Sequence, residues 1–326
     1  MAPVLKVEGL STFFDTWRGV IRAVDDVSLQ VEVGDTLGIV GESGCGKTVL
    51  SLSIMKLVPT PPGKYVGGKI LLGNQDLLSL QENEMRKIRG KSISMIFQEP
   101  MTSLNPVFRI GDQIRETLEL HQRGSRREVW ERAVEMLRTV GITQPEQRMR
   151  DYPHQLSGGM RQRVMIAMAL SCRPRLMIAD EPTTALDVTI QAQILELMKQ
   201  LQRELGTAVI LITHDLGVIS QTARQVAMMY AGQFVEYAEA GVIFSRPLHP
   251  YTVGLLESIP CIGGKFGPGK RLPMISGGAP DLAAMRSSGC RFHERCVDVM
   301  PVCRNLEPPW RKNDHPHQYV RCWKYH

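Results

Sequence analysis

The sequence predicts an α/β fold, a mainly parallel sheet with helices on both faces. An apolar run at 37–40 is followed by the glycine-rich segment 41–48 and then by a helical segment at 49–58. Two further apolar runs, at 176–179 and 208–213, are separated by a second helical segment. Strands that alternate with helices in this way form parallel sheets covered on both sides.

Length and composition are those of an ordinary globular protein. The chain has 326 residues, of which 43% are hydrophobic and 22% are charged, so it is long enough for two domains. The net charge of +6 decides little about partners. No apolar run approaches ~18 residues, and the start at Met1 lacks the apolar stretch of a secretory signal. We therefore expect a cytoplasmic chain in which most of the 7 cysteines are reduced thiols or metal ligands.

The first part of the chain predicts antiparallel strands. Residues 4–10 and 22–33 alternate apolar and polar side chains, which is typical of strands with one solvated face. Phe13, Phe14 and Trp17 lie between them, where an aromatic ring either stacks on a nucleotide base or packs against the protein.

The middle of the chain alternates loops, strands and helices. A Pro/Gly-rich segment predicts a loop, and two helical segments with mixed charge predict a helical insertion between strands. The expected elements are the loop 59–68, strands 69–72 and 93–97, helices 110–121 and 125–140, helix 164–171 after Leu156–Gln162, and helix 190–205.

Residues Gly41–Thr48 fit the phosphate-loop template, Gly-x-x-x-x-Gly-Lys-Ser/Thr. Glycines allow the backbone to form a concavity of N–H donors, and the following helix adds its positive N-terminal charge. The Lys47 ammonium would reach the outer phosphates, and the Thr48 hydroxyl would bind Mg²⁺. The alternative is a glycine-rich turn without function. The residues expected at the nucleotide are Gly41, Ser43, Gly44, Cys45, Gly46, Lys47 and Thr48.

The strand 176–179 ends at Asp180 and Glu181. A carboxylate at the end of a buried strand suits a Mg²⁺ site, and a second one beside it can polarise water. An isolated acidic pair can also cap a loop, but with a phosphate loop upstream we favour the catalytic interpretation. His214 follows the next strand, where it either senses a terminal phosphate or caps the following helix.

Taken in order, these motifs resemble the nucleotide-binding subunit of ATP-binding-cassette (ABC) transporters over residues 4–240. The resemblance is carried by the phosphate loop, Gln98, the Leu-Ser-Gly-Gly stretch in Leu156–Gln162, Asp180-Glu181, Ala185-Leu186-Asp187 and His214. It implies an ABC-type fold with antiparallel edge strands and a helical subdomain at about 100–172.

The resemblance also implies roles for single residues. Thr48, Gln98 and Asp180 would surround Mg²⁺, Gln98 would also sense the attacking water, and Glu181 would polarise that water. His214 would contact the γ-phosphate, and spacing favours Phe14 for stacking on adenine. Ser157, Gly158 and Gly159 would contact ATP bound to a second cassette, so the site would be complete only in a head-to-tail dimer.

Downstream, Arg246–Thr252 contains His-Pro-Tyr and resembles the extension of peptide and nickel importer ATPases. Residues 49–55 resemble the D-type subunit of dipeptide and oligopeptide importers. This implies an ATP-hydrolysing importer subunit on the cytoplasmic face of the inner membrane, with a nucleotide-binding domain at 1–240 and an extension at 241–326. Its partners would be a sister ATPase, two membrane permease subunits and an external substrate-binding protein. The cargo would be a peptide or, alternatively, nickel or another small solute.

The extension predicts a cysteine-rich site. Its four cysteines are spaced more widely than the paired ligands of most zinc sites, whereas a [4Fe–4S] cluster accepts varied spacing. The peptide-importer resemblance also implies such a cluster, while Zn²⁺ and no metal remain alternatives. His293, His315 and His317 are alternatives for one ligand. The expected ligands are Cys290, Cys296, Cys303 and Cys322.

A second class of function is a soluble cassette ATPase that acts on nucleic acid. The basic composition favours it slightly, but the single cassette and the His-Pro-Tyr extension favour transport, so we expect no nucleic-acid partner. A third alternative is a degenerate cassette that binds ATP without hydrolysing it. The presence of Lys47, Asp180, Glu181 and His214 argues against it.

Overall fold

The computed structural model describes residues 3–98, 103–184, 186–259, 275–283, 285, 288–313 and 317–326. The chain divides into two compact units. The first unit comprises residues 1–6, 30–36 and 70–212, and the second comprises residues 7–29, 37–69 and 213–326.

The first unit contains a parallel three-stranded layer. Strand β7 (Leu176–Asp180) lies between β6 (Ile93–Ile96) and β8 (Ala208–Ile212), with Ile93 opposite Leu176 and Leu176 opposite Ala208. Every residue of β7 and β8 is buried, as expected for parallel strands covered on both faces. The predicted parallel strands are therefore confirmed.

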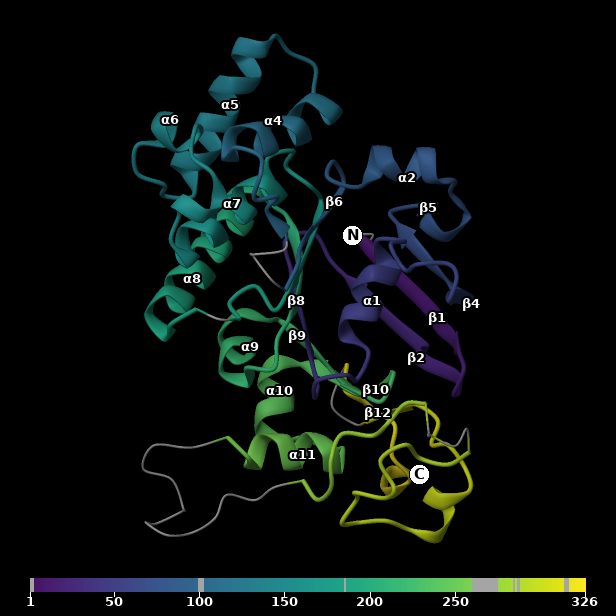
Figure 1. Cartoon of the computed structure of the whole chain (residues 1–326). Coiled ribbons are helices and arrows are strands. Elements are labelled where there is room, and N and C mark those ends of the chain that lie inside the picture. Colours follow the sequence, from purple (N-terminus) through teal and green to yellow (C-terminus); the bar gives the residue numbers. More distant parts are fainter. Residues whose placement is uncertain are drawn as a thin grey trace. The chain divides into compact units, whose positions relative to one another are not determined.

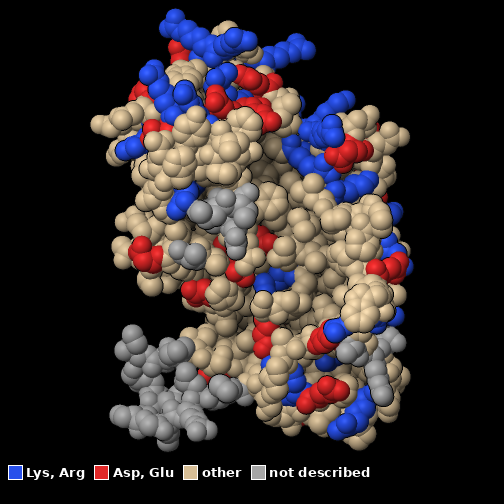
Figure 2. Space-filling view, in the orientation of Figure 1, with Lys and Arg blue, Asp and Glu red and all other residues tan. Residues whose placement is uncertain are grey.

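Helices α4 (Ile110–His121), α5 (Arg126–Thr139), α6 (Pro145–Arg148) and α7 (Gly158–Leu170) of the first unit pack on one another (Figure 1). Figure 2 shows Lys, Arg, Asp and Glu side chains mixed over the α4–α5 region. The predicted helical insertion is confirmed. The remaining elements of this unit are β5 (Gln75–Asp76), η1 (Leu77–Ser79), α2 (Glu82–Ile88), η2 (Pro153–Gln155) and α8 (Val188–Leu205).

Helix α7 begins six residues earlier than the sequence predicts, at Gly158 instead of Val164. The Ser157 hydroxyl accepts the N–H of Met160 and so caps the helix directly after the Leu-Ser segment. The two glycines, which the prediction placed before the helix, therefore form its first turn.

In the second unit, residues 37–40 of β3 (Thr36–Val40) pair in parallel with β9 (Gln225–Tyr230). Strand β9 continues into an antiparallel series, β9–β10–β12–β11. Its members after β9 are β10 (Gln233–Glu239), β12 (Tyr319–Val320) and β11 (Arg311–Lys312). The end of the chain thus adds two short strands to the edge of the layer that carries β3.

The second unit also holds most of β1 (Leu5–Thr16), β2 (Gly19–Val31) and β4 (Gly63–Leu72). The early strands are longer than predicted, so Phe13 and Phe14 lie on β1 and not in a loop between strands. Residues 63–68, predicted as loop, begin β4, because Gly68 with φ of +94° allows close approach to the β1 backbone.

The helices of the second unit are α1 (Lys47–Ile54), α9 (Leu216–Thr222), α10 (Ala240–Ser245) and α11 (Pro250–Glu257). Two short 3₁₀ turns, η3 (Pro301–Arg304) and η4 (Trp323–Tyr325), lie in the C-terminal segment. Within the described ranges of the whole chain, no helix combines the length and the apolar character needed to cross a bilayer.

Candidate nucleotide-binding and hydrolysis residues

The phosphate loop connects β3 to α1 in the second unit. Its backbone conformation and close packing require glycine at three positions. A Cβ at Gly41 would lie 2.1 Å from the Met229 carbonyl oxygen and 2.7 Å from the Cys45 sulfur. Gly44 and Gly46 have φ of +78° and +108°, the left-handed region that favours glycine. The loop can therefore curve only with glycine at these three positions.

Lys47 is buried and folds back over the loop. Its Nζ donates to the carbonyl oxygens of Gly41 at 2.7 Å and Glu42 at 2.9 Å. Thr48, the next residue of α1, is exposed. An ammonium beside a helix start and an exposed hydroxyl form the arrangement that binds phosphate and Mg²⁺.

The Cys45 thiol points into the protein. It is buried, and this burial raises its pKa above the ordinary value for cysteine. Its backbone oxygen accepts the N–H of Gly232 at 2.8 Å, which ties the loop to the turn between β9 and β10. Cys45 therefore contributes its backbone to the loop, while its side chain packs under Gly41.

His214 lies at the same edge of the β3 layer as the phosphate loop. The preceding Thr213 donates its backbone N–H to Ile39 of β3 at 3.4 Å. The alternative that His214 caps the next helix is wrong, because Asp215 caps α9 by accepting the N–H groups of Gly217 and Val218. The imidazole is exposed.

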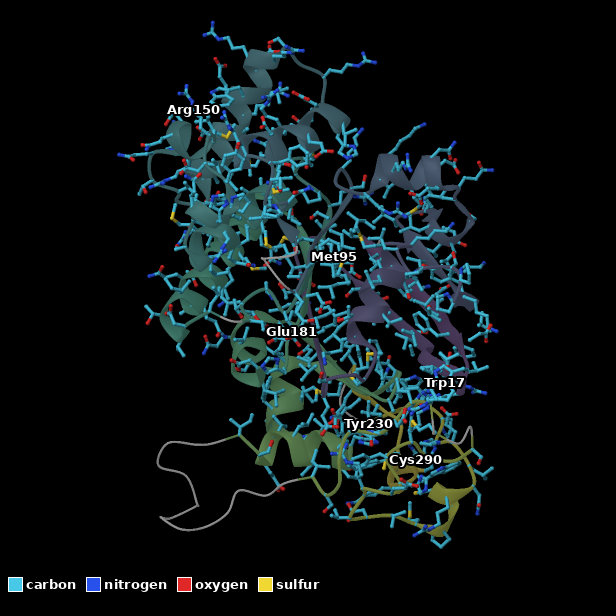
Figure 3. All side chains as sticks on the ribbon, viewed as in Figure 1. Trp17, Met95, Arg150, Glu181, Tyr230 and Cys290 are labelled. Atoms are coloured by element: carbon cyan, nitrogen blue, oxygen red, sulfur yellow. The ribbon has the colours of Figure 1, made fainter. Side chains whose placement is uncertain are left out.

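In the first unit, Gln98 and Glu181 are brought together although 83 residues separate them. The Gln98 side-chain amide donates to Glu181 Oε2 at 3.1 Å, and the Thr184 hydroxyl donates to the same oxygen at 3.0 Å. Glu181 has φ of +47°, uncommon for a residue other than glycine. Such backbone conformations cluster at functional sites, and this one accompanies a carboxylate held by two donors. Figure 3 labels Glu181.

Asp180 is the last residue of β7 and is buried. Its position is set by pairing with Ile212 of β8. The carboxylate thus sits at the carboxyl end of the parallel strands, where open α/β sheets bind ligands.

Ser157, Gly158 and Gly159 form the start of α7. Ser157 is exposed, whereas Leu156 before it is buried and anchors the turn. A Cβ at Gly159 would lie 3.0 Å from Ile190 of α8, so the glycine permits close packing of α7 on α8. The N-terminus of a 13-residue helix is thereby presented at the surface, where its amides attract an anion.

Residues 24–184 match the ABC transporter family, and residues 235–303 match the C-terminal region of oligopeptide/dipeptide transporters. The oligopeptide transport ATP-binding protein AppD of Bacillus subtilis is 51% identical over 325 residues, which cover 100% of this chain and 98% of AppD. The dipeptide transport ATP-binding protein DppD of the same organism is 50% identical, covering 99% of this chain and 95% of DppD.

The chain belongs to the ATP-binding proteins of peptide ABC transporters.

The fold of this ABC protein is shared with solved cassettes. The dimeric ABC transporter cassette MJ0796 superposes with a TM-score of 0.65 and 29% identity, covering 72% of this chain and 98% of that one. A second structure of MJ0796, a dimer in a post-hydrolysis state bound to ADP and Pi, gives the same values. The predicted ABC-type α/β fold is confirmed.

The His-Pro-Tyr sequence of this ABC protein starts α11 of the second unit. His249 is fully buried, and burial lowers its pKa to about 3, so the ring is neutral. Its Nδ1 accepts the N–H of Tyr251 and caps the helix. The backbone N–H groups of Leu248 and His249 donate to the buried carboxylate of Glu236. These contacts fix where the Tyr251 ring points.

Glu42, Tyr251 and Arg295 make contacts at the phosphate loop that were not predicted from the sequence. The Glu42 backbone N–H donates to the Tyr251 hydroxyl at 2.9 Å, and Arg295 forms an ion pair with the Glu42 carboxylate. The His-Pro-Tyr match itself marked Tyr251, but nothing in the sequence pairs position 42 with position 295.

The aromatic residue that stacks on adenine stays a prediction. Phe14 is half-buried on β1 and lies next to Gly63 at the start of β4. Phe13 lies under the Arg22 guanidinium, 5.4 Å from its central carbon. Trp17 is 89% exposed (Figure 3).

The four C-terminal cysteines are free thiols within electrostatic range of one another. The pKa of Cys290 is raised to about 12, mainly because the thiol is partly buried. The neighbouring sulfurs of Cys303, Cys322 and Cys296 raise it further. The N–H of Cys290 donates to the Cys303 carbonyl oxygen at 2.8 Å. Among the residues that the structure describes, no group of three or more His, Cys, Asp or Glu surrounds a single point as ligands of one ion would.

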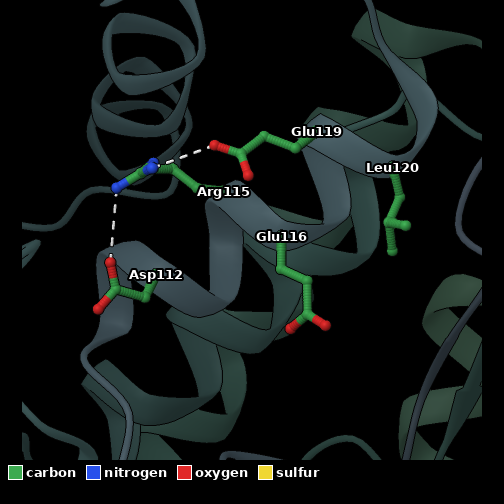
Figure 4. A pocket seen from close by; sticks show the side chains of 5 residues that line it. All are labelled: Asp112, Arg115, Glu116, Glu119 and Leu120. Atoms are coloured by element: carbon green, nitrogen blue, oxygen red, sulfur yellow. Dashed lines mark hydrogen bonds and ion pairs between the residues drawn. The ribbon is translucent and has the colours of Figure 1, made fainter. Parts of the chain in front are cut away.

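Helix α4 carries a hollow outside these groups, lined by Asp112, Arg115, Glu116, Glu119 and Leu120 (Figure 4). Arg115 bridges Asp112 and Glu119, which lie one turn before and after it. The pairs satisfy three of the four charged groups locally, so the hollow has no arrangement for catalysis.

Several residues named in the sequence analysis lie outside the described part of the chain. They are Ala185 of the segment after the acidic pair and the histidine alternative His315.

Proposed function

We propose that this chain is the ATP-hydrolysing subunit of a peptide importer. The observation that carries the proposal is the likeness to peptide transport ATP-binding proteins, which runs through both the cassette and the C-terminal region. Within the molecule, the hydrogen bond between Gln98 and Glu181 supports hydrolysis. A carboxylate that is fixed in position can act as a general base for water, and a polar side chain beside it can orient that water.

The chemistry assigns a step to each group. Lys47 exchanges the carbonyl oxygens of Gly41 and Glu42 for phosphate oxygens when nucleotide binds. Glu181 orients a water and accepts its proton as the water attacks the γ-phosphate, and His214 hydrogen-bonds that phosphate. The leaving group is ADP.

The donors proposed for Mg²⁺ are all oxygen atoms, from Thr48, Gln98 and Asp180. A hydroxyl, an amide oxygen and a carboxylate suit this hard cation, so the residues present fit it. When bound, Mg²⁺ would neutralise charge on the β- and γ-phosphates.

We propose that two cassettes, this chain and a sister ATPase, enclose ATP together. The exposed helix start at Ser157–Gly159 supports this, since its amides are available to an anion that another chain carries. The dimeric cassettes among the structural relatives support it as well. Hydrolysis then separates the two cassettes.

The surface of the first unit supports a permease contact. Phe97, Val107, Phe108 and Leu120 are exposed apolar residues, and Leu120 borders the charged hollow of α4. Where exposed apolar side chains gather into one patch, they mark an interaction site. We therefore place this unit against two membrane permease subunits at the cytoplasmic face of the inner membrane, with an external substrate-binding protein delivering the peptide and no nucleic acid involved.

For the domains, we propose a nucleotide-binding domain at 1–240 and a cysteine-bearing extension at 241–326 that holds a [4Fe–4S] cluster. Four buried or half-buried thiols in one another's electric field support the cluster. A cluster gives each thiolate its own iron, whereas one Zn²⁺ needs all four sulfurs around one point. The cluster would crosslink a segment with few apolar residues, and its donors would be Cys290, Cys296, Cys303 and Cys322.

The function is tested by reconstituting the chain with its sister ATPase, the permease subunits and the binding protein in vesicles. We expect uptake of labelled peptide that requires Mg·ATP and stops with Lys47→Ala. Nickel uptake without peptide uptake would reassign the cargo, and ATP hydrolysis without any uptake would overturn the transport role.

A further inference from the structure

We propose that the C-terminal region holds the phosphate loop in its nucleotide-binding shape through a clamp on Glu42, formed by Tyr251 and Arg295. All three residues belong to the second unit. Glu42 follows the first glycine of the loop, and its two ends are gripped separately, the backbone by Tyr251 and the carboxylate by Arg295. Tyr251 and Arg295 would be positioning residues, which act on nucleotide through the loop.

The Tyr251 half of the clamp is rigid. The side chain is completely buried, and its hydroxyl accepts the Glu42 N–H at 2.9 Å. The ring packs against Tyr230 and Phe292, with ring centroids 4.8 and 5.5 Å apart. Because His249 and Glu236 fix the start of α11, the hydroxyl has one available position. This gives the buried His249 and Tyr251 of the His-Pro-Tyr sequence a specific task.

The Arg295 half is a two-point ion pair. Nη1 lies 2.6 Å from Glu42 Oε2, and Nη2 lies 2.9 Å from Oε1. The Arg295 side chain is only 8% exposed, and its Nε donates to the Ser276 carbonyl oxygen at 2.9 Å. Parallel bonds of this kind fix orientation as well as charge. The pair therefore determines where the Glu42 carboxylate points.

The clamp bears directly on Lys47. The two carbonyl oxygens that hold the Lys47 ammonium belong to Gly41 and Glu42. A shift of Glu42 therefore moves the place from which this ammonium reaches phosphate. The Glu42 N–H is already bonded to Tyr251, so the amides that receive phosphate lie farther along the loop.

Charge gives the clamp a second effect. Glu42 puts a carboxylate into a loop that binds a polyanion, and an unpaired carboxylate there would repel phosphate. Arg295 neutralises it inside a partly buried pair, where salt screens the interaction weakly. Arg295 directly precedes Cys296, so the segment that carries the proposed cluster also carries the countercharge of the phosphate loop.

The test measures the Kd of Mg·ADP for the full-length chain by calorimetry, since ADP binds the loop without hydrolysis. We expect Arg295→Gln to weaken binding about 10- to 100-fold, within the range of coupling found for close charged pairs. Removing the unpaired Glu42 carboxylate should restore part of the affinity. The double variant Glu42→Gln/Arg295→Gln should therefore bind Mg·ADP more tightly than Arg295→Gln alone. Tyr251→Phe, which deletes one oxygen and keeps the packing, should weaken binding about 3- to 10-fold.

Arg321→Gln is the matched control. Arg321 is 7% exposed and pairs with Asp26 and Glu307, which lie outside the phosphate loop, so this variant should lower thermal stability and leave the ADP Kd unchanged. Equal weakening by Arg295→Gln and Arg321→Gln, or no rescue by Glu42→Gln, would overturn the clamp. If Arg295→Gln does not fold, Tyr251→Phe decides, and an unchanged Kd there overturns the proposal. The inference rests on the proposed ATP site, which fails separately if the unaltered chain binds no Mg·ADP.

Discussion

Gln98 donates its side-chain amide to the Glu181 carboxylate across 3.1 Å, joining the end of β6 to the end of β7. The bond links Gln98, which is proposed to bind Mg²⁺ and sense the attacking water, with Glu181, which is proposed to activate that water. Since Thr184 holds the same Glu181 oxygen, the plane of the carboxylate is set before substrate arrives. Preorganisation of this kind reduces the reorganisation that a reaction step requires.

Replacing Glu181 by Gln should abolish turnover and preserve nucleotide binding. The amide keeps the shape of the side chain but cannot accept a proton, so steady-state hydrolysis should fall about 10²- to 10⁴-fold. Phosphate release measures the rate, and size-exclusion chromatography with ATP should reveal a trapped dimer with the sister subunit. Glu196→Gln on the exposed face of α8 is the control. Undiminished hydrolysis would remove Glu181 from the role of general base.

Thr184→Val should lower kcat modestly. It removes the hydroxyl that donates to Glu181 at 3.0 Å, and the loss of one such bond is worth about 1 kcal/mol, or roughly 5-fold in rate. KM for ATP should stay constant, because Thr184 is not expected to touch the substrate. Thr139→Val on the exposed side of α5 is the control. It loses the hydrogen bond from the Thr139 hydroxyl to the Glu135 carbonyl oxygen and should leave kcat and KM unchanged. A change confined to KM would contradict the positioning role.

Gly41→Ala should destabilise the phosphate loop. The added methyl would lie 2.1 Å from the Met229 carbonyl oxygen, so backbone must move. We expect a loss of about 1–3 kcal/mol in unfolding free energy together with weakened Mg·ADP binding. Gly67→Ala on β4, where nothing lies within 4 Å of the added methyl, is the control in the same unit. Equal melting temperatures for the two variants would argue against the close contact.

The buried His249 makes stability fall in mild acid. Its folded pKa of about 3 lies below the ordinary 6.5, so between these values the unfolded chain binds a proton that the folded chain refuses. Stability from this residue is complete above pH 6.5 and is lost as the pH falls. From pH 7.5 to 5.5 the loss is about 1.4 kcal/mol.

Urea unfolding of the native chain and of His249→Asn at both pH values measures this effect. Asparagine can still accept the Tyr251 N–H but does not titrate. The unfolding free energy of the variant should therefore decrease less between pH 7.5 and 5.5 than that of the native chain. Burial raises the pKa of Glu236, which acts in the opposite direction but remains in both proteins. If both proteins lose the same unfolding free energy between pH 7.5 and 5.5, a group other than His249 causes the acid sensitivity.

Anaerobic purification should yield brown protein with about four irons per chain. Cys290→Ala should lose the colour and the iron, because it removes one of four ligands. Cys172→Ala is the control, since Cys172 lies beside Ser171 and Thr117 in the first unit. A colourless protein with one zinc per chain would decide for the zinc alternative.

Local patterns in the sequence were enough for much of the fold. The bounds of α4 agree with the predicted 110–121, because its apolar residues recur with helical period. The starts of α7 and β4 were missed, since both involve glycines whose role is set by neighbours. Gly159 packs on Ile190, and Gly68 approaches the β1 backbone. Periodicity carries no information about such contacts.

In the candidate site, too, local motifs were predictable and contacts between distant residues were not. The phosphate loop and the acidic pair are contiguous motifs, so each was visible as a string of residues. The bond of Gln98 to Glu181 was foreseen only as a shared role, and the contact of Glu42 with Arg295 was not foreseen at all. Ion pairs between distant residues leave no local pattern, because any of 39 Lys and Arg residues has the right charge.

The partners Glu42 and Arg295 are 253 positions apart along the chain. A ribosome that adds roughly 5–20 residues per second needs on the order of 10–50 s to pass from one to the other. During that interval the nascent phosphate loop exists without its arginine. On this proposal the phosphate loop is braced only after Arg295 has been translated, so a truncated product that stops before Arg295 would carry every cassette motif and still have an unbraced loop.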